Sequence, residues 1–375
     1  MTRLDPVRLL AVARKEARQL RRDRRSLVLA FLLPLLLLVF FGYAISWDVR
    51  DIALAVVDQD GSARSRELVE SFESSGYFTV VARPAAPGAA RELFARGRAI
   101  LVLVIPPGFA ADLGRGAPVE VQALLDGSDA NTATIAQGYA EAVAQSFGQR
   151  VLLRGERFAL PLAAESRVWF NEELKSRNMI VPGLVAVIMM IIAALLTSLT
   201  IAREWERGTM EQLAATPVTR LEVVLGKLLP YLAIGFFDTL LSSALGVWFF
   251  AVPFRGSVLL LAGLSLLFLV GSLGLGLFIS AAARSQVLAT QVAMVATFIP
   301  AFLLSGFMFA IEVMPGPLQA LTLLVPARYF LVVTRGIFLK GVGAQVLAPQ
   351  AAIMVLYAVA GLGLAVAKFR KEIDG

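Results

Sequence analysis

Residues 202–230, AREWERGTMEQLAATPVTRLEVVLGKLLP, place a short charged segment between two long apolar runs. Charged side chains are costly in hydrocarbon, so residues 202–228, called the island below, must project into water or onto a partner. The flanking runs, Ile180–Ile201 and Leu229–Phe250, each reach the roughly 20 apolar residues that a helix needs to cross a bilayer. The sequence therefore predicts a membrane protein with a polar projection between two spans.

The composition extends this prediction to the whole chain. Apolar residues make up 58% of it and charged residues 17%, against about 45–50% and about 25% in soluble domains. We predict an α-helical polytopic membrane protein with six transmembrane helices. The predicted spans are Leu27–Ser46, Ile180–Ile201, Leu229–Phe250, Ser257–Ser280, Leu288–Ala310 and Gln350–Ala367.

The orientation follows from Lys and Arg in the short loops, which are enriched on the cytoplasmic side. With the N-terminus inside, the inside segments carry 17 Lys and Arg and the short outside segments carry 4. The inside segments are 1–26, 202–228, 281–287 and 368–375, and the short outside segments are 251–256 and 311–349. We therefore expect a multi-pass membrane protein with both termini and the island in the cytoplasm.

Residues 1–26 have a helical pattern with basic and apolar residues on opposite sides. Such a basic amphipathic helix suits the anionic inner leaflet. It would position the first span, 27–46, and contact a partner, or serve as a plain topology anchor. The net charge of +7 is thereby accounted for without a nucleic-acid partner.

The insert 47–179 alternates strand-like and helix-like segments, which predicts an external α/β domain between spans one and two. Two acidic turns, 58–62 and 126–129, lie where strands meet helices, so we interpret them as turns and N-caps rather than metal sites. The predicted strands are Ile52–Asp58, Tyr77–Ala82, Ala99–Ile105 and Val119–Asp126. The predicted helices are Ser62–Ser75, Ala89–Ala95, Pro106–Leu113 and Ala130–Arg157.

Residues with chemical function are scarce. The chain has no cysteine and no histidine, which removes disulfides, thiolates and the commonest general base. It has no P-loop, because Gly226-Lys227 is followed by Leu228 instead of Ser or Thr. We therefore predict no catalytic residue, cofactor or metal in this chain.

The island itself has the pattern of a helix-turn-helix. Thr209-x-x-Gln212 and Thr219-x-x-Glu222 each fit a capping box, and Thr216-Pro217 separates the helices that they would begin. One interpretation is a rigid docking element. The other is a solvated loop whose charges pair with water and with each other.

Motifs in and beyond the island resemble those of the ABC-2-type permeases of ABC exporters. They include Arg203–Leu213 (REWERGTMEQL), Thr216-Pro217-Val218, Gly226–Pro230 (GKLLP), Leu304–Phe309 (LSGFMF) and Arg335–Gly341 (RGIFLKG). The resemblance covers nearly the whole chain. It is closest to the drug-efflux subgroup with a large external domain, although Ala310 stands where Pro is common.

The resemblance implies a separate cytoplasmic ATPase, which would bind ATP and Mg²⁺, and a second permease as a homodimer partner or similar subunit. By analogy, a membrane-fusion adaptor could accompany them. The five-helix domain 180–375 would then contain the coupling loop 202–228 and the re-entrant segment 311–349. The residues implied in ATPase coupling are Arg203, Glu204, Glu206, Arg207, Gly208, Thr209, Glu211 and Gln212.

Four charged residues lie apart from the island. Asp238, inside the third span, could contact substrate or a proton, bond across a dimer interface, or bond a polar group on a neighbouring helix. Glu312, Arg328 and Arg335 could pair with one another and stabilise the re-entrant segment. Gly271, Gly274 and Gly276 predict close helix packing in the fourth span.

The leading functional hypothesis is an ATP-driven permease that exports a hydrophobic or amphipathic substrate. The alternative is a membrane-anchored ligand sensor or scaffold that binds through its external domain. An ion-driven transporter is a third reading, weakened because Asp238 is the only charge at mid-membrane depth in the predicted spans.

Overall fold

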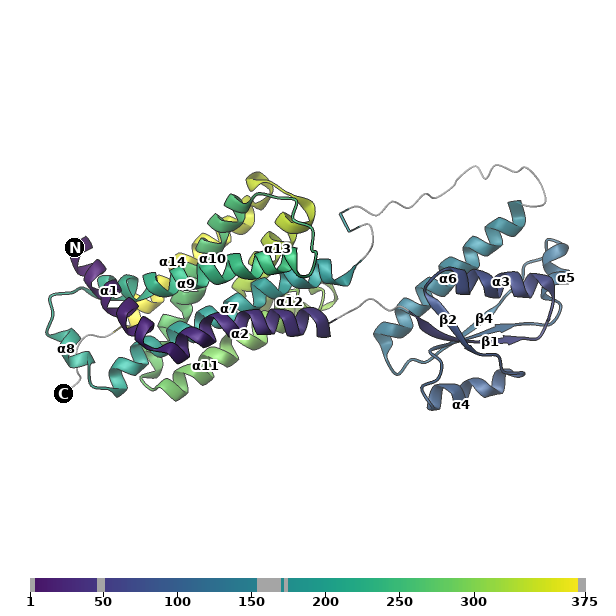
Figure 1. Cartoon of the computed structure of the whole chain (residues 1–375), viewed down its shortest axis with the longest axis horizontal. Helices are drawn as coiled ribbons and strands as arrows, with labels where there is room; N and C mark the ends of the chain where they lie inside the picture. The colour runs from purple at the N-terminus through teal and green to yellow at the C-terminus, as the bar shows by residue number, and fades with distance from the viewer. Residues whose placement is uncertain (1–3, 46–50, 154–169, 172–174, 370–375) are drawn as a thin grey trace. The chain divides into compact units, whose positions relative to one another are not determined.

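The computed structural model describes residues 4–45, 51–153, 170–171 and 175–369. The chain forms two compact units (Figure 1). Met1–Ser46 and Val168–Gly375 make the first, called the helical unit, and Trp47–Arg167 make the second, called the α/β unit. Two ends of predicted elements, Ser46 and residues 154–157, lie outside the described residues.

The helical unit is built from long apolar helices. Within the described part of the chain, five are long and apolar enough to cross a membrane. The bounds are α1 Pro6–Arg22, α2 Arg24–Ala44, α7 Ser176–Glu206, α8 Met210–Ala214, α9 Arg220–Trp248, α10 Val258–Ala283, α11 Gln286–Ile299, α12 Gly316–Thr322, α13 Pro326–Arg335 and α14 Ala344–Lys368. The five are α7, α9, α10, α11 extended to Leu304, and α14.

The remaining predicted span and the re-entrant segment differ from those five. The first predicted span lies in α2, whose described apolar part, Ala30–Ala44, is shorter. The pair formed by α12 and Pro326–Lys340 is bent by 78°, as in a broken span or a re-entrant loop. Counting that pair as one span gives up to six among the described residues.

Two predicted boundaries are wrong. The fifth span was expected to reach Ala310, but its helix ends at Leu304. Pro300 begins a π-helical turn there, and Gly306 has a left-handed φ of +82°, which helices do not continue through. The last helix starts at Ala344, so residues 344–349 belong to it and not to the segment 311–349.

Small residues set the distance between the central helices. A β-carbon on Gly276 of α10 would come within 2.5 Å of the Ala194 carbonyl oxygen of α7. A β-carbon on Gly274 would lie 2.9 Å from the carbonyl carbon of Gly361 on α14. These contacts leave no room for larger side chains, which confirms the predicted close packing of the fourth span.

The α/β unit contains a four-stranded sheet in the order β2-β1-β3-β4. The strand β1 is parallel to β2 and β3, with Ile52 opposite Phe78 and Leu54 opposite Leu101, and β4 is antiparallel to β3. The strands are β1 Ile52–Asp58, β2 Phe78–Ala82, β3 Leu101–Ile105 and β4 Gln122–Leu125. They confirm the predicted strands to within a few residues.

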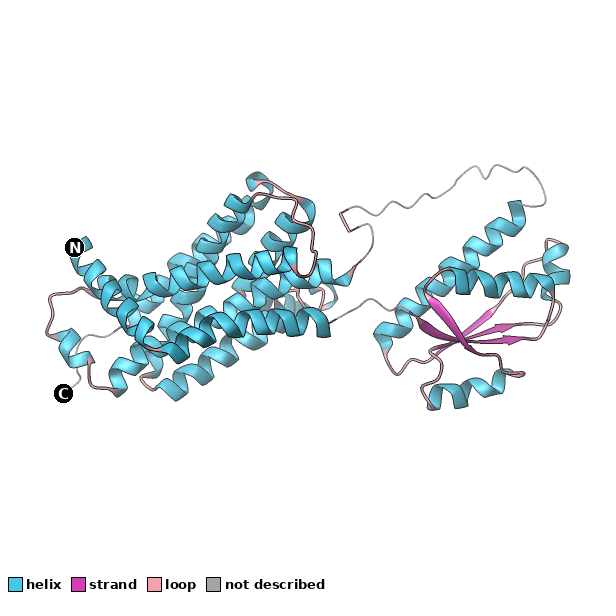
Figure 2. Cartoon of the chain, viewed as in Figure 1, coloured by secondary structure: helices cyan, strands magenta, loops and turns pink. Residues whose placement is uncertain are grey.

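Helices cover both faces of this sheet (Figure 2). One face of β1 packs against α3, α5 and α6, and the other face packs against α4. The period-2 alternation of strand side chains produces these two separate cores. The helices are α3 Ala63–Ser74, α4 Ala90–Ala95, α5 Phe109–Gly114 and α6 Ala130–Leu153.

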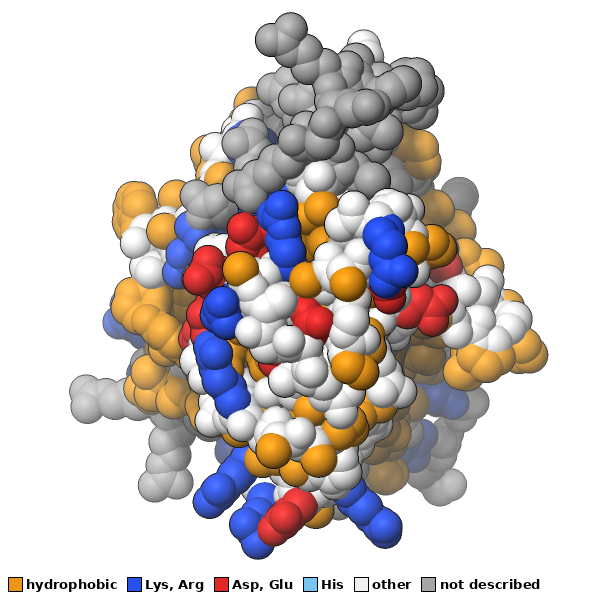
Figure 3. Space-filling model, turned by 90° about the vertical axis from the view of Figure 1, so that its right-hand side faces the viewer, with side chains coloured by type: hydrophobic (Ala, Val, Ile, Leu, Met, Phe, Trp, Pro, Cys, Tyr) orange, Lys and Arg blue, Asp and Glu red, His pale blue; other side chains and the backbone are white. Residues whose placement is uncertain are grey.

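The surface charges of the α/β unit are locally balanced. Acidic and basic side chains alternate over the face that Figure 3 presents, and short-range ion pairs such as Arg64–Glu67 and Arg115–Asp112 neutralise them. The predicted acidic turns act within the fold. Asp58 accepts a hydrogen bond from the Ser65 hydroxyl, and Asp60 accepts from the Gly108 amide.

Candidate coupling face

The N-terminal helix α1 lies directly on the start of α9 (Figure 1). Its side chains Val12, Glu16 and Leu20 are buried. A β-carbon on Gly226 of α9 would lie 2.7 Å from Val12 Cβ, so only glycine allows the helices to come this close. Much of the apolar face that the sequence assigned to the inner leaflet is therefore covered by protein, although Leu10 remains 61% exposed.

A buried charge cluster joins α1 to α7 and α9. Lys227 Nζ lies 3.0 Å from Glu16 Oε2 and 3.0 Å from Glu204 Oε1. Lys15 Nζ bonds the same Glu204 oxygen at 2.6 Å, and the Tyr231 hydroxyl donates to Glu16 Oε1 at 3.2 Å. Glu16, Lys227 and Glu204 are each at most 3% exposed. Charges so deeply removed from water are tolerated only when paired, so the cluster fixes the relative positions of these three helices.

The end of α7 is held by a second set of polar contacts. Arg203 lies 3.4 Å from Asp23 and donates to Gln286. Glu206 accepts from the backbone N–H of the same Gln286 at 2.7 Å and from its side-chain amide. The helix then stops, because Gly208 adopts a left-handed φ of +67° after Arg207. Arg203, Glu204 and Glu206 thus belong to a helix end rather than to a loop.

The first predicted capping box is wrong. Thr209 has a helical backbone, with φ −78° and ψ −6°, and makes no side-chain cap bond to α8. An N-cap residue needs an extended backbone for its oxygen to reach the N2 or N3 amide. Instead, the Thr209 hydroxyl and backbone N–H both donate to the Glu204 carbonyl.

The second predicted capping box is confirmed. Thr219 caps α9, and the Glu222 carboxylate accepts the Thr219 backbone N–H at 2.7 Å. The other Glu222 oxygen accepts the backbone N–H of Asp5 at 2.8 Å, and Arg8 donates to the Pro217 carbonyl. The start of α1 is therefore tied to the turn before α9.

Two predicted coupling residues face outwards. Glu211 and Gln212 of α8 are exposed, and neither side chain has a hydrogen bond or ion pair with another described residue. They stand on a five-residue helix between two anchored helix ends. The face made by α1, the end of α7, α8 and the start of α9 is called the coupling face below.

The other predicted site residues are remote from this face. Asp238 of α9 is fully buried, and neither carboxylate oxygen has a hydrogen-bond partner among the described residues. Arg335 donates to the carbonyl of Met179 at the beginning of α7. Met179 and Arg203 lie roughly 36 Å apart along this helix, at about 1.5 Å per residue.

The predicted pairing among the re-entrant charges is wrong. Arg328 bonds the Thr322 hydroxyl, Arg335 bonds the carbonyls of Met179 and Gly306, and Glu312 is exposed. Arg335 therefore bonds two backbone carbonyls in place of a carboxylate, and its Nη2 atom has no hydrogen-bond partner among the described residues.

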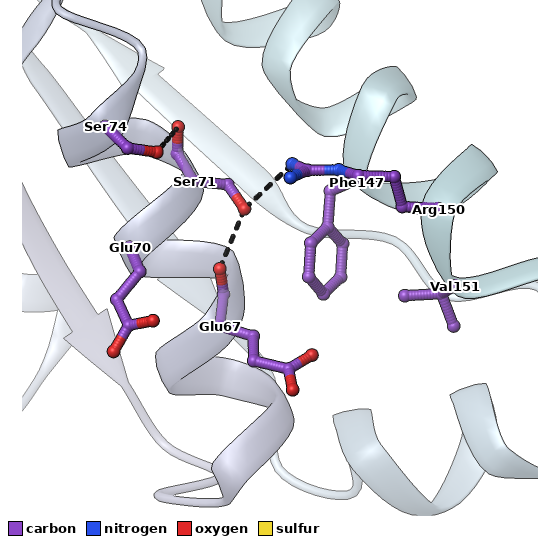
Figure 4. Close-up of a pocket in the computed structure, with 7 residues that line it drawn as sticks. All are labelled: Glu67, Glu70, Ser71, Ser74, Phe147, Arg150 and Val151. Atoms are coloured by element: carbon purple, nitrogen blue, oxygen red, sulfur yellow. Dashed lines mark hydrogen bonds between the residues drawn. The ribbon is translucent and has the colours of Figure 1, made fainter. Parts of the chain in front are cut away.

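The α/β unit carries a pocket of about 380 Å³ between α3 and α6 (Figure 4). In it, Arg150 donates to the Ser71 hydroxyl at 3.0 Å, and Ser71 donates to the Glu67 carbonyl at 2.8 Å. Glu70 and Phe147 also line it. No local sequence pattern predicts this pocket, because its two walls are far apart in the chain: Ser71 and Arg150 are 79 residues apart.

The buried cluster contains residues that sequence reasoning missed. The sequence predicts no pairing for Glu16, Lys227 or Tyr231. The signal was present for Glu16, since it falls between Val12 and Leu20 on the apolar side of an amphipathic helix. An acid in that position requires a buried cation.

Together, the apolar helices and the charged coupling face at one end of the helical unit are those of a multi-pass membrane protein. Residues 24–367 match the model of the ABC-2 family transporter proteins. The chain therefore belongs to the ABC-2 family, the class of ABC transporter permeases.

Named relatives match along almost the whole chain. The "Probable multidrug ABC transporter permease YbhS" of Escherichia coli strain K12 is 38% identical over 372 residues, 98% of each chain. The "Probable multidrug ABC transporter permease YbhR" of the same strain is 31% identical over 98% of this chain and 99% of its own. The "Inner membrane transport permease YhhJ" is 27% identical over 85% of each chain.

Proposed function

We propose that this chain is the permease subunit of an ATP-driven exporter in a bacterial inner membrane. It moves a hydrophobic or amphipathic substrate, such as a drug-like compound or a lipid, out of the cell. The names of the relatives, two probable multidrug permeases and an inner-membrane transport permease, support the substrate class and the membrane. The energy comes from a separate ABC ATPase, a partner that family membership implies.

The observation that carries this proposal is the build of the coupling face. The exposed helix α8 stands between two helix ends that buried charges and caps hold rigidly. A force applied to α8 by a docked ATPase would reach α7 and α9 directly, because each flanking turn is short. In this proposal the coupling face, both termini and the ATPase are cytoplasmic, and the α/β unit is external.

The assembly follows from the same family. A dimeric arrangement is implied for ABC-2 permeases, and we propose a homodimer or a pair with a similar subunit. A membrane-fusion adaptor that meets the external α/β unit would complete an export path.

The docking role of α8 can be tested with two exposed residues. Replacing Glu211 and Gln212 with alanine removes polar groups that hold nothing in place within the chain. We expect ATPase co-purification and ATP-driven efflux from proteoliposomes to fall at least several-fold, with no change in folding. Glu312→Ala is the matched control, because Glu312 is equally exposed but lies apart from the coupling face. Equal efflux in both variants would contradict the assignment.

A second candidate function rests on the pocket of Figure 4. Its volume of about 380 Å³ is in the range of small-ligand sites, so the chain would be a membrane-anchored sensor. Ligand binding to purified protein, abolished by Arg150→Ala, together with an absence of ATP-dependent flux, would favour the sensor. Flux that persists in Arg150→Ala would favour the exporter.

A further inference from the structure

A basic cavity opens where α1 ends and α7 ends. Its volume is about 650 Å³, and it is open to the surroundings. Five cations line it, with Gln19 and a single carboxylate, Asp23. The cations are Lys15, Arg18, Arg22, Arg203 and Arg207.

These cations fall into two groups. Lys15 and Arg203 are paired, with Glu204 at 2.6 Å and Asp23 at 3.4 Å, and so form fixed walls. Arg18, Arg22 and Arg207 are exposed, and the described part of the chain offers them no acidic partner. Three unpaired guanidinium groups around one cavity repel each other unless an anion joins them. In the α/β unit, by comparison, four arginines each have a carboxylate beside them, namely Arg64, Arg83, Arg96 and Arg115.

The two helices that lead into the cavity indicate where it lies relative to the membrane. Asp23 lines the cavity, and α2 begins one residue later and continues as an apolar helix. On the other side, Arg203 follows the apolar stretch of α7 that ends at Ala202. Both helices pass from apolar to charged at the cavity, which places it at the boundary between hydrocarbon and water. Lipid phosphates lie at that boundary.

We propose that this cavity binds the phosphate group of an anionic phospholipid from the adjoining leaflet. Guanidinium groups match phosphate oxygens in pairs of parallel hydrogen bonds, and three of them are available here. Basic pockets beside membrane helices are known to hold anionic headgroups. A bound headgroup would clamp α1 against the end of α7, and so make the stiffness of the coupling face depend on the lipid composition.

A soluble phosphate is the other source of the same chemistry. It would leave the membrane side of the cavity empty, whereas the acyl chains of a lipid continue along the apolar helices below Asp23 and Arg203. The geometry therefore favours the lipid. The proposal concerns the bilayer alone, so it can fail while the exporter function stands.

The test uses the full chain in detergent, titrated with phosphatidylglycerol, phosphatidylcholine or inorganic phosphate, with the thermal midpoint and native mass spectrometry as readouts. The variant Arg18→Ala/Arg22→Ala removes two cavity cations from α1. The control Arg14→Ala/Arg21→Ala removes two exposed arginines from the same helix that do not line the cavity. Both lose the same charge, so a general attraction to anionic lipid cancels.

We expect phosphatidylglycerol to raise the midpoint of the wild type and the control equally, and to raise that of the cavity variant by less than half as much. Retained lipid in mass spectra should fall in parallel. Phosphatidylcholine should act equally on all three proteins, which also reports on folding. An undiminished phosphatidylglycerol shift in the cavity variant would overturn the proposal, as would an equal shift from inorganic phosphate. Loss of ATPase binding with lipid binding unchanged would assign the cavity to the protein partner instead.

Discussion

Replacing Lys227 with methionine should damage the protein far more than replacing Lys15, although both lysines bond the same oxygen of Glu204. By distance alone Lys15 is the stronger partner, at 2.6 Å against 3.0 Å. Burial makes Lys227 the more important partner for stability, despite its longer distance. The side chain of Lys227 is 2% exposed and that of Lys15 is 50% exposed.

The magnitude follows from what each change leaves behind. Without Lys227, Glu16 keeps only the Tyr231 hydroxyl as a partner in the cluster, so a buried carboxylate is left without a cation. Breaking a buried pair in this way costs about 3–5 kcal/mol. Without Lys15, Glu204 keeps Lys227, and a half-exposed pair contributes only about 0–1 kcal/mol.

The assay is denaturant unfolding of the purified protein in detergent, followed by tryptophan fluorescence. A third variant, Lys227→Met with Glu16→Gln, removes the stranded charge on Glu16 while Glu204 keeps Lys15. It should recover more than half of the lost free energy of unfolding, because a neutral pair no longer carries the desolvation cost of an isolated ion.

Two results would refute this reasoning. The first is a loss of unfolding free energy for Lys15→Met that is as large as the loss for Lys227→Met, which would mean that distance outweighs burial. The second is a double variant that is less stable than Lys227→Met alone, which would mean that Glu16 is stabilised without its cation.

Two further predictions come from other parts of the chain. Gly276→Ala should destabilise the helical unit by about 1–3 kcal/mol, since the added β-carbon would meet the Ala194 backbone. The control in unfolding measurements is Gly263→Ala on the same helix, where an added β-carbon would meet no neighbouring atom within 4 Å. Hydrogen bonds to Asp60 hold the pKa of its carboxyl below the usual value; the bond from the Ser62 hydroxyl contributes most, and those from the backbone amides of Ala110 and Gly108 contribute less. The stabilisation is therefore present above the unfolded pKa and is lost as pH falls through the lower folded pKa. Hydrogen exchange of residues 106–114 should be faster in Asp60→Asn at about pH 6, and this difference should vanish in strong acid; a constant difference would contradict the assignment.

Most of the architecture could be predicted because each element has a local cause. The second to fifth spans and the last span follow from apolar length, and the four strands follow from short, largely apolar runs between turn residues. The Thr219 cap follows from four adjacent residues. Predictions failed where the outcome depended on backbone conformation, as at Thr209, whose helical φ and ψ prevent capping.

In the candidate site, too, the local features could be predicted from the sequence and the long-range contacts could not. Exposed residues of α8 follow from the island's own sequence, but Glu16 and Lys227 are 211 residues apart. No local pattern pairs them. Arg335 also finds its partners at a distance, in the backbone carbonyls of Met179 and Gly306.

By itself the sequence determined that this protein spans a membrane, which segments are apolar enough to cross it, and that a charged island interrupts them. Hydrophobicity and capping act over a few neighbouring residues, so these features are encoded locally. The tertiary structure decided what that island rests on. It brought α1 onto α9 through the gap at Gly226, buried a lysine between two glutamates, and gathered three unpaired arginines around one cavity. Those features depend on distances between segments that are far apart in the chain, and such distances are set only when the helices pack.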